Sequence, residues 1–226
     1  MYRLATQAQR KYYNEFMYPW QDEIFAMIQS RKFYLTGGTC LSRFYYQHRY
    51  SDDLDFFFDG INYTKEEFEI EFREIYNRIA HKYKALLKVN SESFKRIILE
   101  SNKGELKIEF IFEPVAFINK RIETDKGILI DTKENIFGNK ITALYGRKAF
   151  KDYIDLYFLM KDFRLEDGIK WSEEKMVPID YEGATFCLLD GQMHGDVWLL
   201  KKIDTNDFEM FTKNLITDLL NYAKTL

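Results

Sequence analysis

The sequence has few of the residues on which several protein classes depend. Among its 226 residues there are 2 cysteines and 3 histidines. Two cysteines are too few for a disulfide framework, and neither has metal-ligand spacing with a histidine. No internal repeat or low-complexity tract occurs. These absences argue against a disulfide scaffold, a zinc module and a repeat protein.

The sequence also lacks a large excess of positive or negative charge, and it lacks long apolar runs. The formal net charge is −3, so the overall balance gives no argument for nucleic acid binding. No apolar run reaches the roughly 20 residues that span a membrane, and the first residues lack the apolar core of a signal peptide. We expect a cytoplasmic protein without a membrane partner. Two local clusters could still form a basic face, although lysines usually solvate surfaces: Arg43, His48 and Arg49; and Lys82, Lys84, Lys88, Lys95 and Arg96.

What the chain does contain predicts a folded core. It is 46% hydrophobic and 17% aromatic, which argues against disorder. Weak patterning favours a helix over residues 2–16, and stronger patterns favour helices over 19–30, 64–83 and 207–223. Thr64 and Glu67 form a capping box for the third of these. Strand-like runs cover 85–89, 94–100 and 106–112, and an edge hairpin is expected within 121–130.

The most informative stretch is residues 33–58. Asp53 and Asp55 stand two positions apart beside an apolar, aromatic run, Leu54 to Phe58, that favours a strand. On a strand both carboxylates leave the same face. Two carboxylates this close repel each other unless a cation lies between them, and oxygen ligands of this kind suit Mg²⁺. The pair therefore predicts a magnesium site.

A Gly-Gly turn precedes the two acids. Gly37 and Gly38 follow a strand pattern and open a helix pattern, so backbone N–H groups can face an anion there. Thr39 and Ser42 add hydroxyl donors. A phosphate-binding turn that leads to a metal-binding strand predicts a nucleoside triphosphate (NTP) held with Mg²⁺.

These residues carry a resemblance to a known family. A strand, Gly-Gly, a spacer and Asp-apolar-Asp-apolar resemble the signature of nucleotidyltransferases with the DNA polymerase beta fold. The strings Gly-Gly-Thr-x-Leu-x-Arg and His-Arg-x-Ser-x-Asp-Leu-Asp-Phe, at 37–43 and 48–56, resemble the AbiEii branch, the toxins of abortive-infection toxin–antitoxin pairs. The resemblance adds Arg49 and Ser51 to the nucleotide-binding set. It also implies a cognate antitoxin and, in some relatives, tRNA as the acceptor.

The resemblance also implies a third acid. The run from Leu106 to Phe112 contains a single acid, Glu109, where this superfamily places its third metal ligand, usually Asp. Asp53, Asp55 and Glu109 would then be catalytic and would hold two Mg²⁺ ions. The alternative is that Glu109 lies on a solvated face beside Lys107. Glu105 and Glu113 are weaker candidates because they lie at strand ends.

Two further motifs lie in the second half. Lys140-Ile-Thr-Ala-Leu and Lys151-Asp152-x-x-Asp155 resemble the AbiEii pattern Lys-apolar-x-Ala-Leu followed by Arg-Asp-x-x-Asp. The resemblance implies that Lys140 contacts the triphosphate and that Asp152 and Asp155 order this lysine or the neighbouring loop. Lys151 replaces the family's arginine, so the bidentate contacts of an arginine are in doubt. Without the resemblance, Lys140 would be an exposed lysine and Asp152 an acid at a helix N-terminus.

Together these features predict an α+β protein. We expect a polymerase-beta-like nucleotidyltransferase core, a mixed sheet with flanking helices, over residues 1–130, and a mainly helical region packed on it over 131–226. The expected activity is Mg²⁺-dependent transfer of a nucleoside monophosphate from an NTP to an acceptor hydroxyl, with RNA as one acceptor class. Two alternatives stay open: transfer to a small molecule such as an antibiotic, and a non-catalytic module that binds a nucleotide or a partner. The sequence identifies neither the NTP, nor the acceptor, nor the oligomeric state.

Overall fold

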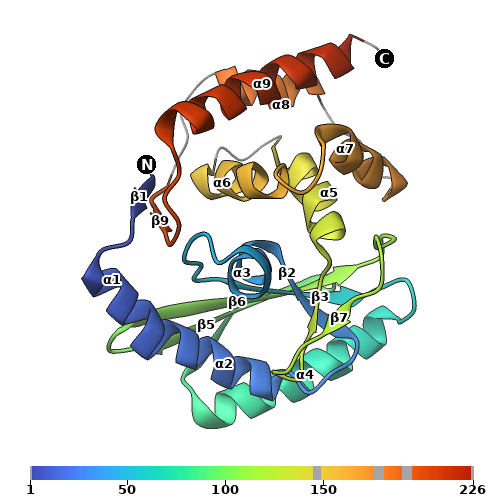
Figure 1. Cartoon of the computed structure of the whole chain (residues 1–226). Helices are drawn as coiled ribbons and strands as arrows, with labels where there is room; N and C mark the ends of the chain where they lie inside the picture. The colour runs from blue at the N-terminus through green and yellow to red at the C-terminus, as the bar shows by residue number, and fades with distance from the viewer. Residues whose placement is uncertain (1, 145–148, 176–180, 190–194, 225–226) are drawn as a thin grey trace.

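The computed structural model describes residues 2–144, 149–175, 181–189 and 195–224 (Figure 1). They contain a seven-stranded sheet in the order β4-β5-β6-β3-β2-β8-β7. β3 is parallel to β6 and antiparallel to β2, which is parallel to β8. The expected mixed sheet is confirmed. Its strands are β2 (Phe33–Thr36), β3 (Leu54–Asp59), β4 (Ala85–Asn90), β5 (Phe94–Ser101), β6 (Gly104–Glu113), β7 (Ile122–Glu123) and β8 (Leu129–Ile130).

Helices flank the sheet on both faces, as expected (Figure 1). α2 (Tyr18–Met27) and α4 (Lys65–Lys82) lie below the sheet in this view, and α2 continues the segment formed by α1 (Gln7–Tyr12) and the π-helical η1 (Tyr13–Met17). α3 (Gly37–Cys40) continues as the π-helical η2 (Leu41–Tyr46) above the sheet. The second half is mainly helical and also lies above it, with α5 (Lys133–Ala143), α6 (Phe150–Leu159), α7 (Leu165–Glu174), α8 (Tyr181–Leu189) and α9 (Thr205–Ala223).

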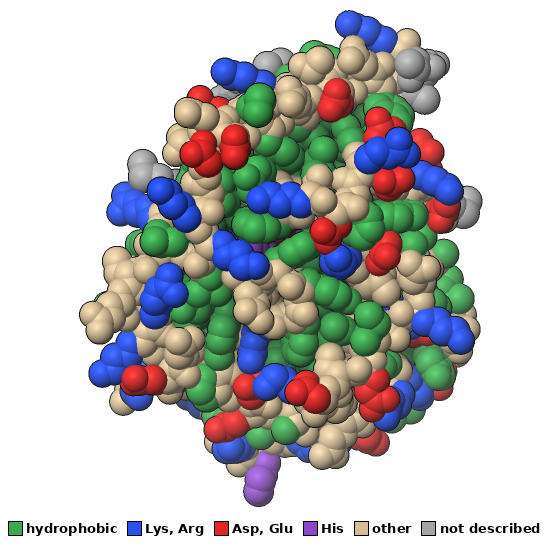
Figure 2. All heavy atoms as spheres, viewed as in Figure 1, with side chains coloured by type: hydrophobic (Ala, Val, Ile, Leu, Met, Phe, Trp, Pro, Cys, Tyr) green, Lys and Arg blue, Asp and Glu red, His purple; other side chains and the backbone are tan. Residues whose placement is uncertain are grey.

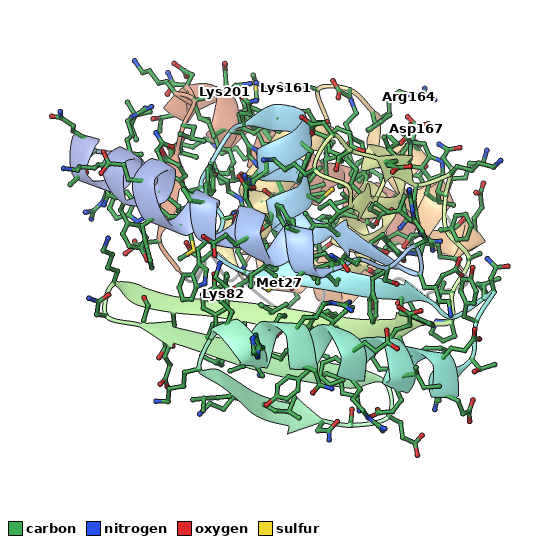
Figure 3. The ribbon with its side chains drawn as sticks, turned by 90° about the horizontal axis from the view of Figure 1, so that it is seen from below. Met27, Lys82, Lys161, Arg164, Asp167 and Lys201 are labelled. Carbon is green, nitrogen blue, oxygen red and sulfur yellow. The ribbon has the colours of Figure 1, made fainter. Side chains whose placement is uncertain are left out.

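The lower layer follows from apolar periodicity. The capping box of Thr64 and Glu67 starts α4 as predicted. The helix buries Phe68, Phe72, Ile75 and Ile79 against the sheet. β6 alternates strictly, so its even-numbered residues from Leu106 to Phe112 are buried on the same side. Figure 3 shows α2 and α4 side by side on this face, with Met27 and Lys82 between them, and Arg78 of α4 donates to the Met27 carbonyl at 2.9 Å.

The N-terminal residues differ from the prediction. We expected a helix from residue 2, but Tyr2–Leu4 form the strand β1, which pairs in parallel with β9 (Val197–Leu199). The Ala5 N–H extends this pairing by donating to the Leu199 carbonyl at 2.8 Å. A partner so distant in sequence cannot be read from local periodicity. The pairing also joins residues on both sides of the expected boundary at 130, and the division into 1–130 and 131–226 stays a prediction.

Surface charge is mixed. On the face shown in Figure 2, Lys and Arg side chains are interspersed with Asp and Glu. Most of the second basic cluster in the sequence is paired with acids, which removes it as a basic face: Lys82 with Glu23, Lys84 with Glu100, Lys95 with Glu69 and Arg96 with Glu109. Among the described residues, no helix is long and apolar enough to cross a membrane.

Candidate active site

The predicted acids lie together at the centre of the sheet. Across four neighbouring strands the register aligns Arg96 of β5, Glu109 of β6, Asp55 of β3 and Thr36 of β2. Glu109 is therefore the direct cross-strand neighbour of Asp55, and Asp53 immediately precedes β3. All three acids line one cleft of about 580 Å³ above the sheet. The structure thus brings together the three residues that the sequence proposed as the catalytic set.

Asp55 is the least compensated of these acids. Within the described part of the chain, no residue donates a hydrogen bond to its carboxylate or forms an ion pair with it. Burial raises the pKa of Asp55 to about 6, and the neighbouring charges of Glu109 and Asp53 add to the rise. A carboxylate that is held among other acids without a partner favours a bound cation.

In the described part of the chain, three basic side chains approach the other two acids. Lys107 Nζ lies 3.1 Å from Asp53 Oδ2 and 3.3 Å from Glu109 Oε1. Lys151 Nζ lies 3.4 Å from the same Asp53 oxygen. Arg96 donates to Glu109 Oε1 at 2.8 Å. Glu109 lies beside Lys107, as the second sequence alternative expected. Both side chains line the cleft, however, as the first alternative requires of Glu109.

The Gly-Gly turn closes the cleft beside Asp55. Gly37 has φ +67°, a left-handed conformation that suits glycine, and a Cβ there would lie 2.8 Å from Asp55 Oδ2. A Cβ on Gly38 would lie 2.2 Å from Arg49 Nη2. Both glycines are needed for close approach, and both line the cleft. Bare backbone therefore faces the space next to the acids.

The two hydroxyl residues after the glycines point elsewhere. Thr39 and Ser42 are buried, and neither is among the described residues that line the cleft. Thr39 Oγ1 contacts the Ser51 hydroxyl at 2.8 Å and the backbone carbonyl of Asp53. Ser42 donates to the Arg49 carbonyl at 2.6 Å. In this structure the two hydroxyls fix the segment that leads to Asp53, whereas Ser51 itself lines the cleft.

A buried charge network supports the far side of the cleft. Arg49 binds Asp155 through two contacts, Nε to Oδ1 at 2.7 Å and Nη2 to Oδ2 at 2.9 Å. His48 Nε2 lies 2.7 Å from the same Asp155 carboxylate. Burial alone would raise the pKa of Asp155, but the charges of Arg49 and Lys140 hold it well below its usual range. Burial lowers the pKa of His48, which favours the neutral imidazole.

Lys140 joins this network from α5. Its ammonium lies 2.6 Å from Asp152 Oδ1 and 2.6 Å from Asp155 Oδ2, and it is buried, so it is not an ordinary exposed lysine. Both acids order Lys140, as the family resemblance implies. Ile136, Asn139 and Lys140 lie on one face of α5 and line the cleft. Phe57 and Ile111, which are paired across β3 and β6, form an apolar end of the lining together with Ile136.

The donor set fits a hard divalent cation, although it is not gathered around one point. Carboxylate oxygens are the ligands that Mg²⁺ prefers, and Asp55 has no other partner among the described residues. Yet within the described ranges no group of three His, Cys, Asp or Glu side chains is close enough to hold an ion. Lys107 lies between Asp53 and Glu109 instead.

Sequence reasoning missed part of the site. It named Lys107 only as a solvated neighbour and Arg96 only as part of a basic cluster. Their alternation with buried residues on β6 and β5 put them on the cleft side, but only the register shows that they meet the acids. A second cavity of about 370 Å³ was also missed; it shares Arg49, Ser51, Asp53 and Lys151 with the first.

Comparisons with known proteins agree with this geometry. A family model described as nucleotidyl transferase AbiEii toxin, type IV TA system, matches residues 23–216. The chain is 30% identical to an uncharacterised protein of Aquifex aeolicus over 158 residues, which is 70% of each protein.

Two solved structures have a similar fold. JHP933 from Helicobacter pylori superposes with a TM-score of 0.58 at 18% identity, covering 99% of this chain and 97% of that one. MenT4, a nucleotidyltransferase toxin of Mycobacterium tuberculosis, superposes with a TM-score of 0.54 at 12% identity, covering 89% of this chain and 82% of that one. At these identities the likeness concerns the fold alone. The family match over residues 23–216, supported by this fold, shows that the chain belongs to the AbiEii family of nucleotidyltransferase toxins.

Proposed function

We propose that this nucleotidyltransferase uses Mg²⁺ to transfer a nucleoside monophosphate from an NTP to an acceptor hydroxyl, releasing pyrophosphate. The observation that carries the proposal is the alignment of Asp55 with Glu109, next to Asp53 and beside the bare backbone of Gly37 and Gly38. Acids that bind a metal, beside a turn that accepts phosphate, are the two parts that phosphoryl transfer requires.

The residues have separate tasks in this mechanism. Gly37 and Gly38 leave room for the triphosphate against backbone N–H groups, and Lys140 supplies positive charge on the opposite wall. The apolar end formed by Phe57 and Ile111 suits the base of the nucleotide. Asp53, Asp55 and Glu109 would hold Mg²⁺. When bound, the metal neutralises charge on the triphosphate and lowers the pKa of the attacking hydroxyl.

We propose RNA as the acceptor. The second cavity opens on Asp53 and Lys151, so a hydroxyl held there would approach the acids from the side opposite the nucleotide base. Its walls include the half-buried Trp198, next to the buried Tyr50, whose ring stacks on Tyr13 with centroids 3.9 Å apart and so leaves Trp198, among the described lining residues, as the aromatic side chain available to a base. An aromatic side chain beside a basic one, here Trp198 with Lys151, is a usual means of holding an unpaired base. Transfer to tRNA, inhibition of growth and neutralisation by a cognate antitoxin follow as parts of this proposal.

The test is a transfer assay. The protein is incubated with Mg²⁺ and each α-labelled NTP in turn, with total RNA, protein extract or small hydroxyl compounds as acceptors. The Asp53→Ala/Asp55→Ala variant removes the acid before β3 and the acid on it, and Asp125→Ala, which changes an exposed acid of the β7–β8 turn, is the matched control.

We expect label in RNA from the wild type and from Asp125→Ala, and none from the double variant. Label in a small compound instead would support the antibiotic-modifying alternative. Equal and negligible transfer by all three proteins, with NTP still bound, would support a non-catalytic binding module. The same variants expressed in cells test the toxin role, because the double variant should no longer inhibit growth.

A further inference from the structure

Lys107 occupies the position where a cation is expected. It lies two residues before Glu109 on β6, and the strict alternation of this strand puts both side chains in the cleft. Its ammonium bridges Asp53 Oδ2 and Glu109 Oε1 at 3.1 and 3.3 Å. The side chain is 33% exposed, so it can also turn toward solvent or toward a ligand in the cleft.

This placement conflicts with direct metal binding. A divalent cation held by Asp53 and Glu109 would lie next to the Lys107 ammonium, and the two positive charges would repel each other at this range. The absence of a compact group of three metal-ligating side chains among the described residues agrees with this conflict. Either the metal does not use these acids, or Lys107 leaves them when the metal arrives.

We propose that Lys107 is an internal counter-ion of the acidic centre, which it releases when Mg²⁺ binds; the inference rests on the proposed function. Lysine suits such an exchange, because it is a point charge on a flexible stem. Arg96 contacts the same Glu109 oxygen through Nε and Nη2, both at 2.8 Å, and its planar group is more firmly held. After release, the Lys107 ammonium remains in the cleft that receives the triphosphate.

The first test measures Mg²⁺ binding by calorimetry in the absence of nucleotide. Lys107→Met keeps an unbranched apolar side chain of nearly the same length and removes the charge. Lys88→Met changes an exposed lysine on β4 of the same sheet and serves as the control. We expect Lys107→Met to bind Mg²⁺ at least about tenfold more tightly than the wild type, and Lys88→Met to match the wild type. Equal or weaker binding by Lys107→Met would overturn the inference.

The second test uses the wild type, so it does not depend on how a variant folds. Lysines are acetylated with and without saturating Mg²⁺, and the rate at each lysine is followed by mass spectrometry. Release from the two acids should raise the reactivity of Lys107 severalfold and leave that of Lys88 unchanged. Unaltered reactivity of Lys107 would contradict the exchange while leaving the proposed function intact. If no Mg²⁺ binds even with NTP present, the proposed function itself fails.

Discussion

Asp55 has no hydrogen-bond or ion-pair partner among the described residues, so its charge should make the metal-free protein less stable at neutral pH than a neutral side chain there would. Its folded-state pKa is raised from 3.8 to about 6. A raised pKa means that the folded protein disfavours the carboxylate. The stability that protonated Asp55 provides is therefore complete below pH 3.8 and is lost as the pH rises through about 6.

The size of the effect follows from the shift. Because one pKa unit corresponds to about 1.4 kcal/mol, a rise from 3.8 to about 6 costs about 3 kcal/mol once Asp55 is ionised. This is an upper limit, since one side of Asp55 faces the open cleft. We expect Asp55→Asn to raise the free energy of unfolding at pH 8 by about 1–3 kcal/mol.

Urea unfolding of wild type and Asp55→Asn from pH 4 to pH 8, with a chelator present, measures this difference. The two curves should converge near about pH 4 and separate as the pH rises. Added Mg²⁺ should stabilise the wild type more than the variant, because the metal binds the ionised carboxylate of Asp55, which the variant lacks. An Asp55→Asn variant that is no more stable than the wild type at pH 8 without metal would refute the reasoning.

Asp59, at the other end of β3, provides a control of opposite sign. Burial would raise its pKa, but hydrogen bonds from Asn62 and from Arg121, at 2.9 and 2.8 Å, lower it instead. Its stabilising contribution is present at neutral pH and is lost as the pH falls through its lowered pKa. Asp59→Asn should therefore destabilise the protein at pH 8, on the same strand where Asp55→Asn stabilises it.

Two further substitutions test the walls of the cleft. Gly38→Ala puts a Cβ 2.2 Å from Arg49 Nη2, and because Asp155 holds that guanidinium, we expect a loss of about 1–3 kcal/mol in urea unfolding; a neutral effect would show that Arg49 can move. Lys140→Met leaves the buried Asp152 and Asp155 without their shared lysine, so unfolding at pH 8 should lose about 3–5 kcal/mol. A smaller loss for Lys140→Met than for Gly38→Ala would contradict this interpretation.

Local patterns were sufficient to predict much of the fold. The capping box and apolar stripe of α4 and the hairpin between β5 and β6 depend on neighbours in the sequence, and the structure confirms them. The short edge hairpin of β7 and β8 is confirmed as well, with Gly127 in its turn at φ +73°. The helix predicted over Tyr2–Leu4 was wrong. These residues pair with a strand near the other end of the chain, which local sequence patterns do not reveal.

The site was less accessible to sequence reasoning. The pair Asp53 and Asp55 was found from its spacing, and Glu109 from a family resemblance. That they line the same cleft depends on the register between β3 and β6, which residue types alone do not reveal. The pairing of Arg49 with Asp155 is equally remote, since it joins the loop before β3 to α6.

The site has a property that no single residue suggests: apart from Asp55, most of its described charged side chains are already paired with one another. Among the described residues, Lys107, Lys151 and Arg96 compensate the acids over the sheet, and Asp152 and Asp155 compensate Arg49 and Lys140 on the opposite wall. Under the proposed function, a triphosphate with Mg²⁺ would enter a cleft in which most charged side chains must exchange an existing partner for the ligand. Such an exchange favours joint binding of metal and nucleotide. The metal compensates the acids that release their lysines, and the triphosphate compensates the basic side chains that are released. Asp55, which has no partner to give up among the described residues, is the natural first contact for the metal.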